Sequence, residues 1–188
     1  MHFYNLVHKD RPVSDVPVAI KLLLVLAFML QLFWHSLQGP VVARAENLPA
    51  PLSAHNYVMS SLGEPIAASK ILNLWLQAFD NQPGTSLSFS QLDYPRLTKW
   101  LDTSLALDPE GSYPMLVAAR VYGNINDPVK QRLMMEYIFE KFSENPDKYW
   151  RWLAHAVITA KHEIKDEKLA LKFADALATK ATGKNVPY

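Results

Sequence analysis

Cysteine is absent from the 188 residues of this chain. Its absence excludes disulfides, iron–sulfur clusters, zinc sites built on thiolates and cysteine nucleophiles. The net charge is also small, +1 at pH 7, whereas a nucleic-acid-binding domain is expected to be basic because it must attract phosphates. We therefore expect no nucleic-acid partner.

Catalytic motifs are also missing. The six glycines form no glycine-rich phosphate loop, and neither a G-x-S-x-G nor an H-E-x-x-H pattern occurs. His155 and His162 are seven residues apart, whereas metal ligands on one helix are usually three or four residues apart. We expect no catalysis, no metal and no cofactor. An enzyme is the less favoured alternative, because catalytic groups can also assemble only in space.

One long apolar run is present at residues 16–37, VPVAIKLLLVLAFMLQLFWHSL. As a helix it would be about 33 Å long, close to the thickness of the hydrocarbon core of a bilayer. We predict a transmembrane helix over 16–38 that contacts the lipid bilayer. Trp34 lies where interfacial aromatic residues are found, and Gln31 is placed to hydrogen-bond with a helix of another subunit. We predict that both residues contact such a membrane helix.

The charges around this run predict its orientation. Three basic residues, Lys9, Arg11 and Lys21, precede the apolar core, and Arg44 alone follows it closely. By the positive-inside rule, residues 1–15 are expected in the cytoplasm and the C-terminal part in the periplasm. A secretory signal peptide is the alternative, because Ala43-Arg44-Ala45 resembles a cleavage site. We expect a retained single-pass anchor in a bacterial inner membrane, with a cleaved, soluble periplasmic adaptor as the alternative.

The rest of the chain divides into a linker and a helical region. Residues 39–63 contain several prolines and no sustained period, which predicts a linker. Residues 64–188 are predicted to be a helical-repeat domain. Its first helix begins near Pro65 after a capping box at Ser61-Leu-Gly-Glu64. The weakly alternating segment 85–92 is predicted to be a loop, because a single strand would have no partner.

Local signals place the remaining helices. Asp93 is predicted to cap a helix that ends at Asp108-Pro109. Further amphipathic helices are predicted over 111–123, 127–143, 147–163 and 166–181. The chain also has Trp75, Trp100, Trp150 and Trp152 at helical spacing among Leu and Ala. We expect most of these tryptophans to pack between helices and one to anchor an interface.

A spacing of 37 residues recurs in this helical region, relating LDPEGSYPML at 107–116 to ENPDKYWRWL at 144–153. The shift aligns Pro109 with Pro146, Tyr113 with Trp150 and Leu116 with Leu153. A helical hairpin cannot bury its apolar face alone, so neighbouring hairpins must stack. We predict an all-α fold in which one transmembrane helix precedes a short α-solenoid of about three helical hairpins.

Several of these residues resemble a tetratricopeptide repeat. Trp150-Arg-Trp-Leu153-Ala154 is similar to the start of the first helix of that repeat, and Asn145-Pro146 and ALDP at 106–109 are similar to its closing residues. The resemblance covers residues 64–187 in three degenerate units. The long loop at 80–92 departs from the pattern.

The resemblance implies a groove, lined by the first helices of successive units, that takes up peptides or partner helices. In the third unit the groove residues would be Lys148, Arg151, His155 and Thr159. Helical geometry also places these four on one stripe, which could alternatively be a merely solvated face. In the second unit the equivalent positions would be Gly111, Pro114, Ala118, Val121 and Tyr122.

These features together predict a non-catalytic function. We expect a membrane-anchored scaffold or accessory subunit of a larger bacterial inner-membrane complex. Its partners would be the other protein subunits of that complex.

Overall fold

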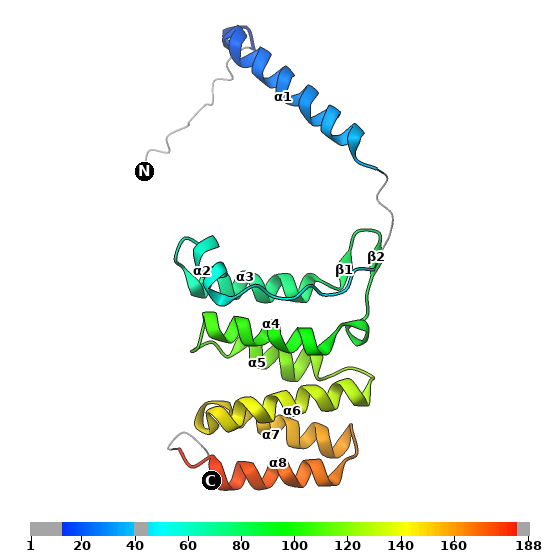
Figure 1. Ribbon diagram of the computed structural model, residues 1–188, viewed down its shortest axis with the longest axis vertical. Coiled ribbons are helices and arrows are strands. Elements are labelled where there is room, and N and C mark those ends of the chain that lie inside the picture. Colours follow the sequence, from blue (N-terminus) through cyan, green and yellow to red (C-terminus); the bar gives the residue numbers. More distant parts are fainter. Residues whose placement is uncertain (1–12, 40–44, 184–188) are drawn as a thin grey trace, which may run out of the picture. The chain divides into compact units, whose positions relative to one another are not determined.

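The computed structural model describes residues 13–39 and 45–183. The chain divides into two units, Met1–Val42 and Ala43–Tyr188, and each is considered by itself. The described residues are mostly helical, which confirms the helical class predicted from the sequence (Figure 1).

The first unit contains the 3-10 turn η1 (Val13–Asp15) and the helix α1 (Val18–Leu37). α1 begins directly after Pro17, has 20 residues, and buries none of its side chains. Its mean hydropathy is 2.0, and its length of about 30 Å matches a bilayer core. α1 is therefore long and apolar enough to cross a membrane, and a signal sequence would have the same properties. Most of the expected cytoplasmic segment 1–15 lies outside the described residues.

The second unit consists of helices joined by mostly short connections. Its elements are α2 (Ala54–Ser60), α3 (Pro65–Ala78), β1 (Asn81–Gln82), β2 (Thr85–Ser86), η2 (Phe89–Gln91), α4 (Tyr94–Leu107), α5 (Tyr113–Val117), η3 (Ala118–Tyr122), α6 (Pro128–Glu144), α7 (Pro146–His162) and α8 (Glu167–Lys180). η3 continues α5 with π-helical geometry and ends where the Gly123 amide donates to the Ala118 carbonyl oxygen at 2.8 Å.

Aspartate caps explain where three of these helices begin. Asp93 accepts a hydrogen bond from the Arg96 amide before α4, and Asp166 accepts one from the Leu169 amide before α8. Asp127 accepts from two amides before α6. Each carboxylate satisfies amides that have no partner in the first turn. The cap predicted at Asp93 is therefore confirmed.

Two local predictions are wrong. The Ser61–Glu64 capping box does not form, because Ser61 ends α2 and its hydroxyl donates to the Val58 carbonyl, while Glu64 makes no side-chain cap. Residues 85–86 are not part of a plain loop, because they pair with Asn81–Gln82 across a turn that contains Gly84 at φ 77°. The pairing partner, Asn81–Gln82, lies immediately before the turn and was not predicted as a strand.

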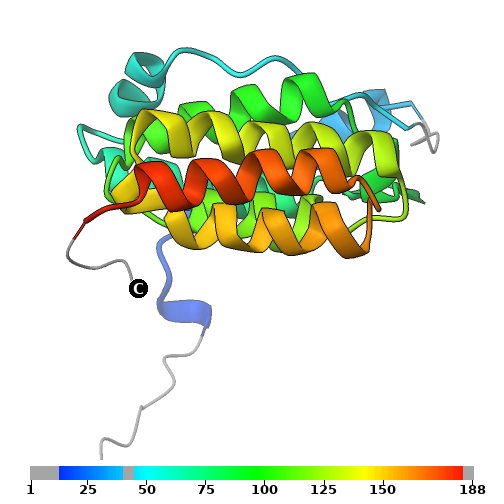
Figure 2. The ribbon, with the colours of Figure 1, turned by 90° about the horizontal axis from the view of Figure 1, so that it is seen from below.

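The helices of the second unit form two rows. The first row holds α3, α5 with η3, and α7, and the second row holds α4, α6 and α8. Figures 1 and 2 show consecutive helices packed side by side. Between non-consecutive helices, Gln77 of α3 hydrogen-bonds to Tyr113 of α5 at 3.0 Å, and Phe139 of α6 stacks on Phe173 of α8 at 5.2 Å between ring centroids.

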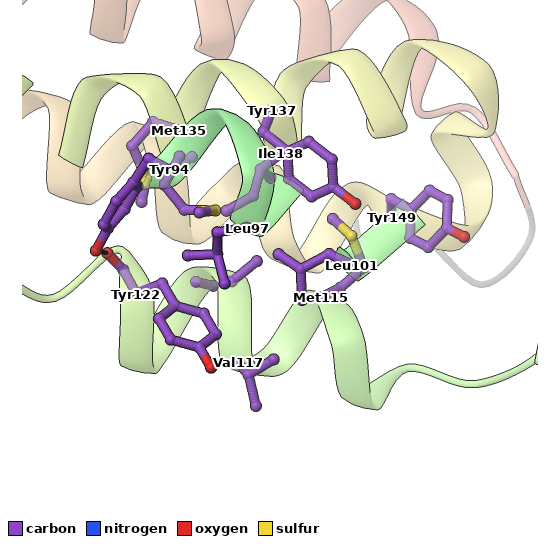
Figure 3. Packing of buried hydrophobic residues seen from close by; sticks show 14 of the residues in the cluster. Tyr94, Leu97, Leu101, Met115, Val117, Tyr122, Met135, Tyr137, Ile138 and Tyr149 are labelled. Atoms are coloured by element: carbon purple, nitrogen blue, oxygen red, sulfur yellow. Dashed lines mark hydrogen bonds between the residues drawn. The ribbon is translucent and has the colours of Figure 1, made fainter. Parts of the chain in front are cut away.

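Apolar side chains from both rows fill the space between them. Figure 3 shows Leu97 and Leu101 of α4 beside Met115 of α5 and Ile138 of α6, and all four are fully buried. Full burial of such a side chain stabilises the fold by about 1.5–3 kcal/mol. The Tyr94 hydroxyl donates to a main-chain carbonyl at the end of η3 at 2.7 Å, which also ties the two rows together.

Residues 45–60, which belong to the predicted linker over 39–63, pack on the helices of the second unit. Leu48 is completely buried, and its carbonyl accepts a hydrogen bond from Arg96 at 2.8 Å. The Trp100 indole donates to the Pro49 carbonyl at 2.8 Å, and α2 packs on α3 and α4. The prolines keep the segment out of helix, but they leave its carbonyls free to accept these bonds. We call residues 45–50 the strap.

Candidate functional site

The four residues of the stripe predicted on α7 differ in their exposure. Thr159 is buried. The Lys148 side chain is 23% exposed, and its ammonium group donates to the Pro109 carbonyl and lies 3.8 Å from the Glu110 carboxylate. Both residues thus have roles inside the fold. Their predicted binding role stays a prediction.

Arg151 and His155 are the accessible members of that stripe. Arg151 is exposed, and its guanidinium lies 5.3 Å from the ring centre of Trp150. His155 is half-buried, with Nδ1 3.5 Å from the Thr159 hydroxyl oxygen. Burial lowers the pKa of His155, and the nearby positive charge of Arg120 lowers it further. These effects favour the neutral imidazole.

Arg120 lies on η3, which packs on α7, and its charge acts on His155 of α7. The same side of α5 and η3 also exposes Tyr113 and Leu116, and α7 exposes Ile158. We call this combined surface the first-row face, and it consists of Tyr113, Leu116, Arg120, Arg151, His155 and Ile158. It presents apolar side chains and two arginines, and the exposed Asp147, one turn before Arg151 on α7, accepts a hydrogen bond from the Gly183 amide.

The groove residues predicted in the second unit are not the exposed ones. Pro114, Ala118 and Tyr122 are buried, and Val121 is half-buried. The exposed positions of α5 and η3 correspond to exposed or half-exposed positions of α7 at a spacing of 38 residues, as Tyr113 does to Arg151. α5 therefore begins one residue out of phase with the predicted spacing of 37. A one-residue slip rotates a helix by about 100°, which turns the predicted stripe inward.

A second exposed surface lies on α2 and α3 and was not predicted. α3 has one charged residue, Lys70, in its 14 residues. Ile71 and Leu74 are 67% and 64% exposed, and Trp75 is 41% exposed. A helix that is apolar on most of its circumference is normally covered. The low charge of residues 65–78 was the available sequence signal.

Aromatic side chains pack against one another at this surface. The ring centroids of Trp75 and Trp100 are 4.8 Å apart, and those of Trp75 and Phe79 are 5.3 Å apart. The ring centroids of Tyr57 of α2 and Trp100 are 6.0 Å apart. Beside them is a groove of about 440 Å³ whose wall is almost entirely apolar. It is lined by Tyr57, Ser60, Ser61, Ala68, Ile71, Leu72, Trp75 and Trp100. We call this region, with the exposed side of α3, the α2–α3 surface.

Buried hydroxyls between α3 and α4 form a polar cluster. The Ser69 and Ser104 hydroxyl oxygens are 2.8 Å apart, and Asn73 Nδ2 donates to the Ser104 hydroxyl at 2.6 Å. Ser69 also approaches the Ser104 carbonyl at 3.0 Å. None of these partners is basic enough to activate a serine as a nucleophile. The cluster fixes the pairing of the two helices.

A charged cleft lies where α4, α6 and α7 meet. The Lys141 ammonium group is 3.0 Å from Asp102 and 2.8 Å from Glu144. The Tyr137 hydroxyl donates to Asp102 at 3.1 Å. Burial, together with the negative charge of Asp102, raises the pKa of Tyr137. Because Lys141 of α6 pairs with Asp102 of α4, the cleft functions as a connection between helices. Within the described residues, no three His, Asp or Glu side chains come together as metal ligands.

The two residues predicted to contact another membrane helix lie on α1. Both Gln31 and Trp34 are exposed in the first unit. Their contact with a partner helix stays a prediction. Comparisons with protein-family models, with curated proteins and with solved structures give no match.

Proposed function

We propose that this protein is a non-catalytic scaffold or accessory subunit of a bacterial inner-membrane complex. α1 would anchor it in a single pass with the N-terminus in the cytoplasm. The helical unit would bind other protein subunits in the periplasm. The first-row face carries the proposal, because it is an exposed surface that combines apolar and cationic side chains.

The proposal includes a short, degenerate tetratricopeptide-like solenoid. Asp108 and Asn145 support it, since they end α4 and α6 with similar dihedral angles, φ −132° and ψ 80° for one, φ −147° and ψ 85° for the other. The second-row helices support it too, because their buried positions recur at the spacing of 37 residues. The recurring pairs are Tyr94 and Gln131, Leu97 and Met134, Leu101 and Ile138, and Leu105 and Phe142.

The chemistry of the first-row face indicates what kind of partner it would take. Arginine and aromatic residues are enriched at protein interfaces, because they offer large contact areas and directed hydrogen bonds. Here Arg120 and Arg151 stand near exposed Tyr113, Leu116 and Ile158. An acidic segment with apolar side chains would match both features. Charge complementarity would also speed its association.

Co-purification of the full-length protein from membranes in mild detergent tests this proposal. We expect the double variant Arg120→Glu, Arg151→Glu to lose most of the protein subunits recovered with the wild type, as quantified by mass spectrometry. Lys99→Glu is the matched control, because Lys99 is exposed on α4 in the second row. Equal recovery with the double variant and the wild type would remove the first-row face from the proposal.

A further inference from the structure

The exposed side of α3 has a self-complementary pattern. Its contact stripe is formed by Ala67, Ile71, Leu74 and Ala78, all exposed. The steps between them are four, three and four residues, and the order is small, large, large, small. Both the spacing and the sizes read the same from either end. An antiparallel copy of α3 would therefore meet this stripe with Ile71 against Leu74 and Ala67 against Ala78.

The flanking residues fit the same arrangement. Lys70 and Trp75 are equally distant from the centre of the stripe, so each Lys70 would face Trp75 of the second copy. An ammonium group over an indole ring is a favourable cation–π contact. The pairing also places Leu74 of one copy beside Ile71 of the other, at the edge of the groove. That groove of about 440 Å³ has room for the leucine side chain.

From this pattern we infer that the α2–α3 surface is a two-fold, antiparallel interface between two copies of this chain. A two-fold contact uses the same patch on both copies and closes after two subunits. This inference is independent of the first-row face and of what binds there.

The opposite end of the helical unit does not favour a head-to-tail contact. The exposed side of α8 carries Leu171 among charged residues, which are Glu167, Lys168, Lys172, Asp175 and Lys180. Covering the apolar stripe of α3 with this side would bury charges without partners. A bilayer is also a poorer match than a second copy. Surface-bound helices usually carry several basic residues, whereas α3 carries only Lys70.

Disulfide trapping tests the register. Because the sequence contains no cysteine, only the introduced cysteines of this chain can form the bond. The variant Ala67→Cys, Ala78→Cys is made in the full-length chain and oxidised in intact cells. The two positions are about 16 Å apart along one helix, which prevents a bond within a chain. Across the antiparallel interface they would face each other. We expect a reducible dimer on gels, at least tenfold more abundant than with either single cysteine.

Two substitutions in the double-cysteine background separate a specific interface from chance collisions. Leu74→Lys should abolish the dimer, and it spares the core because Leu74 is exposed. Leu171→Lys on α8 is the control, since Leu171 is similarly exposed, and it should leave the dimer unchanged. Cross-linking by Ala67→Cys alone as strong as by the pair would overturn the antiparallel register. Absence of dimer, or cross-linking to a different polypeptide, would overturn the inference itself.

Discussion

Leu116 and Leu153 occupy the same place in the sequence repeat and opposite environments in the fold. Leu153 is completely buried, whereas Leu116 is 38% exposed. The residue that corresponds to Leu153 by burial is Met115, which is also completely buried. At the scale of a residue, the one-residue phase difference of α5 decides whether a leucine stabilises the core or faces solvent.

This difference predicts unequal effects of two identical substitutions. Leu153→Ala should lower the free energy of unfolding by about 2–5 kcal/mol, because it removes buried methyl groups and leaves a cavity. Leu116→Ala should lower the free energy of unfolding by less than about 1 kcal/mol, because truncating a partly exposed side chain removes little buried surface. Urea unfolding of both variants, followed by circular dichroism, measures the difference. Equal losses would contradict the phase assigned to α5.

At the scale of an element, the proline-rich strap is held on the helical unit by hydrogen bonds. Gln82 hydrogen-bonds to both the amide and the carbonyl of Glu46, at 2.7 and 2.9 Å. Further along, Arg96 and Trp100 hold the carbonyls of Leu48 and Pro49. The strap therefore follows α4 and satisfies two side-chain donors on it. A freely moving linker would leave the buried Trp100 indole without this partner.

The strap is expected to contribute to stability. Leu48→Ala should reduce the free energy of unfolding of the helical unit by about 2–4 kcal/mol, because Leu48 is a fully buried leucine. Leu52→Ala is the control, as Leu52 follows the strap and is exposed. Urea unfolding followed by tryptophan fluorescence suits this test, because Trp100 reports on the same contact. An unchanged midpoint in Leu48→Ala would show that the strap does not stay on α4.

At the scale of the whole molecule, the remaining choice concerns α1. Its length and hydropathy fit a membrane anchor and a signal sequence equally well. The two possibilities differ in covalent structure, because a signal peptide is removed from the mature chain. We propose the anchor, since it would hold the helical unit beside the membrane subunits that it is proposed to bind.

Intact mass and cell fractionation decide between these possibilities. For an anchor, the protein isolated from cells should retain residues 1–45 and sediment with membranes. Replacing Leu24, Val25 and Leu26 with charged residues should release it, because each charge at the centre of a span costs about 2.5–3.5 kcal/mol. A mature mass that lacks residues 1–45 would instead identify the soluble adaptor.

The sequence by itself determined where most of the helices of this protein begin and end, because those signals act within one turn of the chain. Asp93 caps α4 wherever that helix packs, and Asp108 and Asn145 before prolines end their helices. The apolar composition of α1 likewise makes it a candidate span without reference to any neighbour.

The tertiary structure alone decided which sides of these elements are covered. The phase of α5, the burial of Thr159 and the docking of the strap depend on contacts between residues far apart in the sequence. For the same reason, the exposed apolar side of α3 could not be located until its other side was seen to pack on α4. Local propensity determines where a helix forms. Only packing against its neighbours determines how that helix is rotated about its axis.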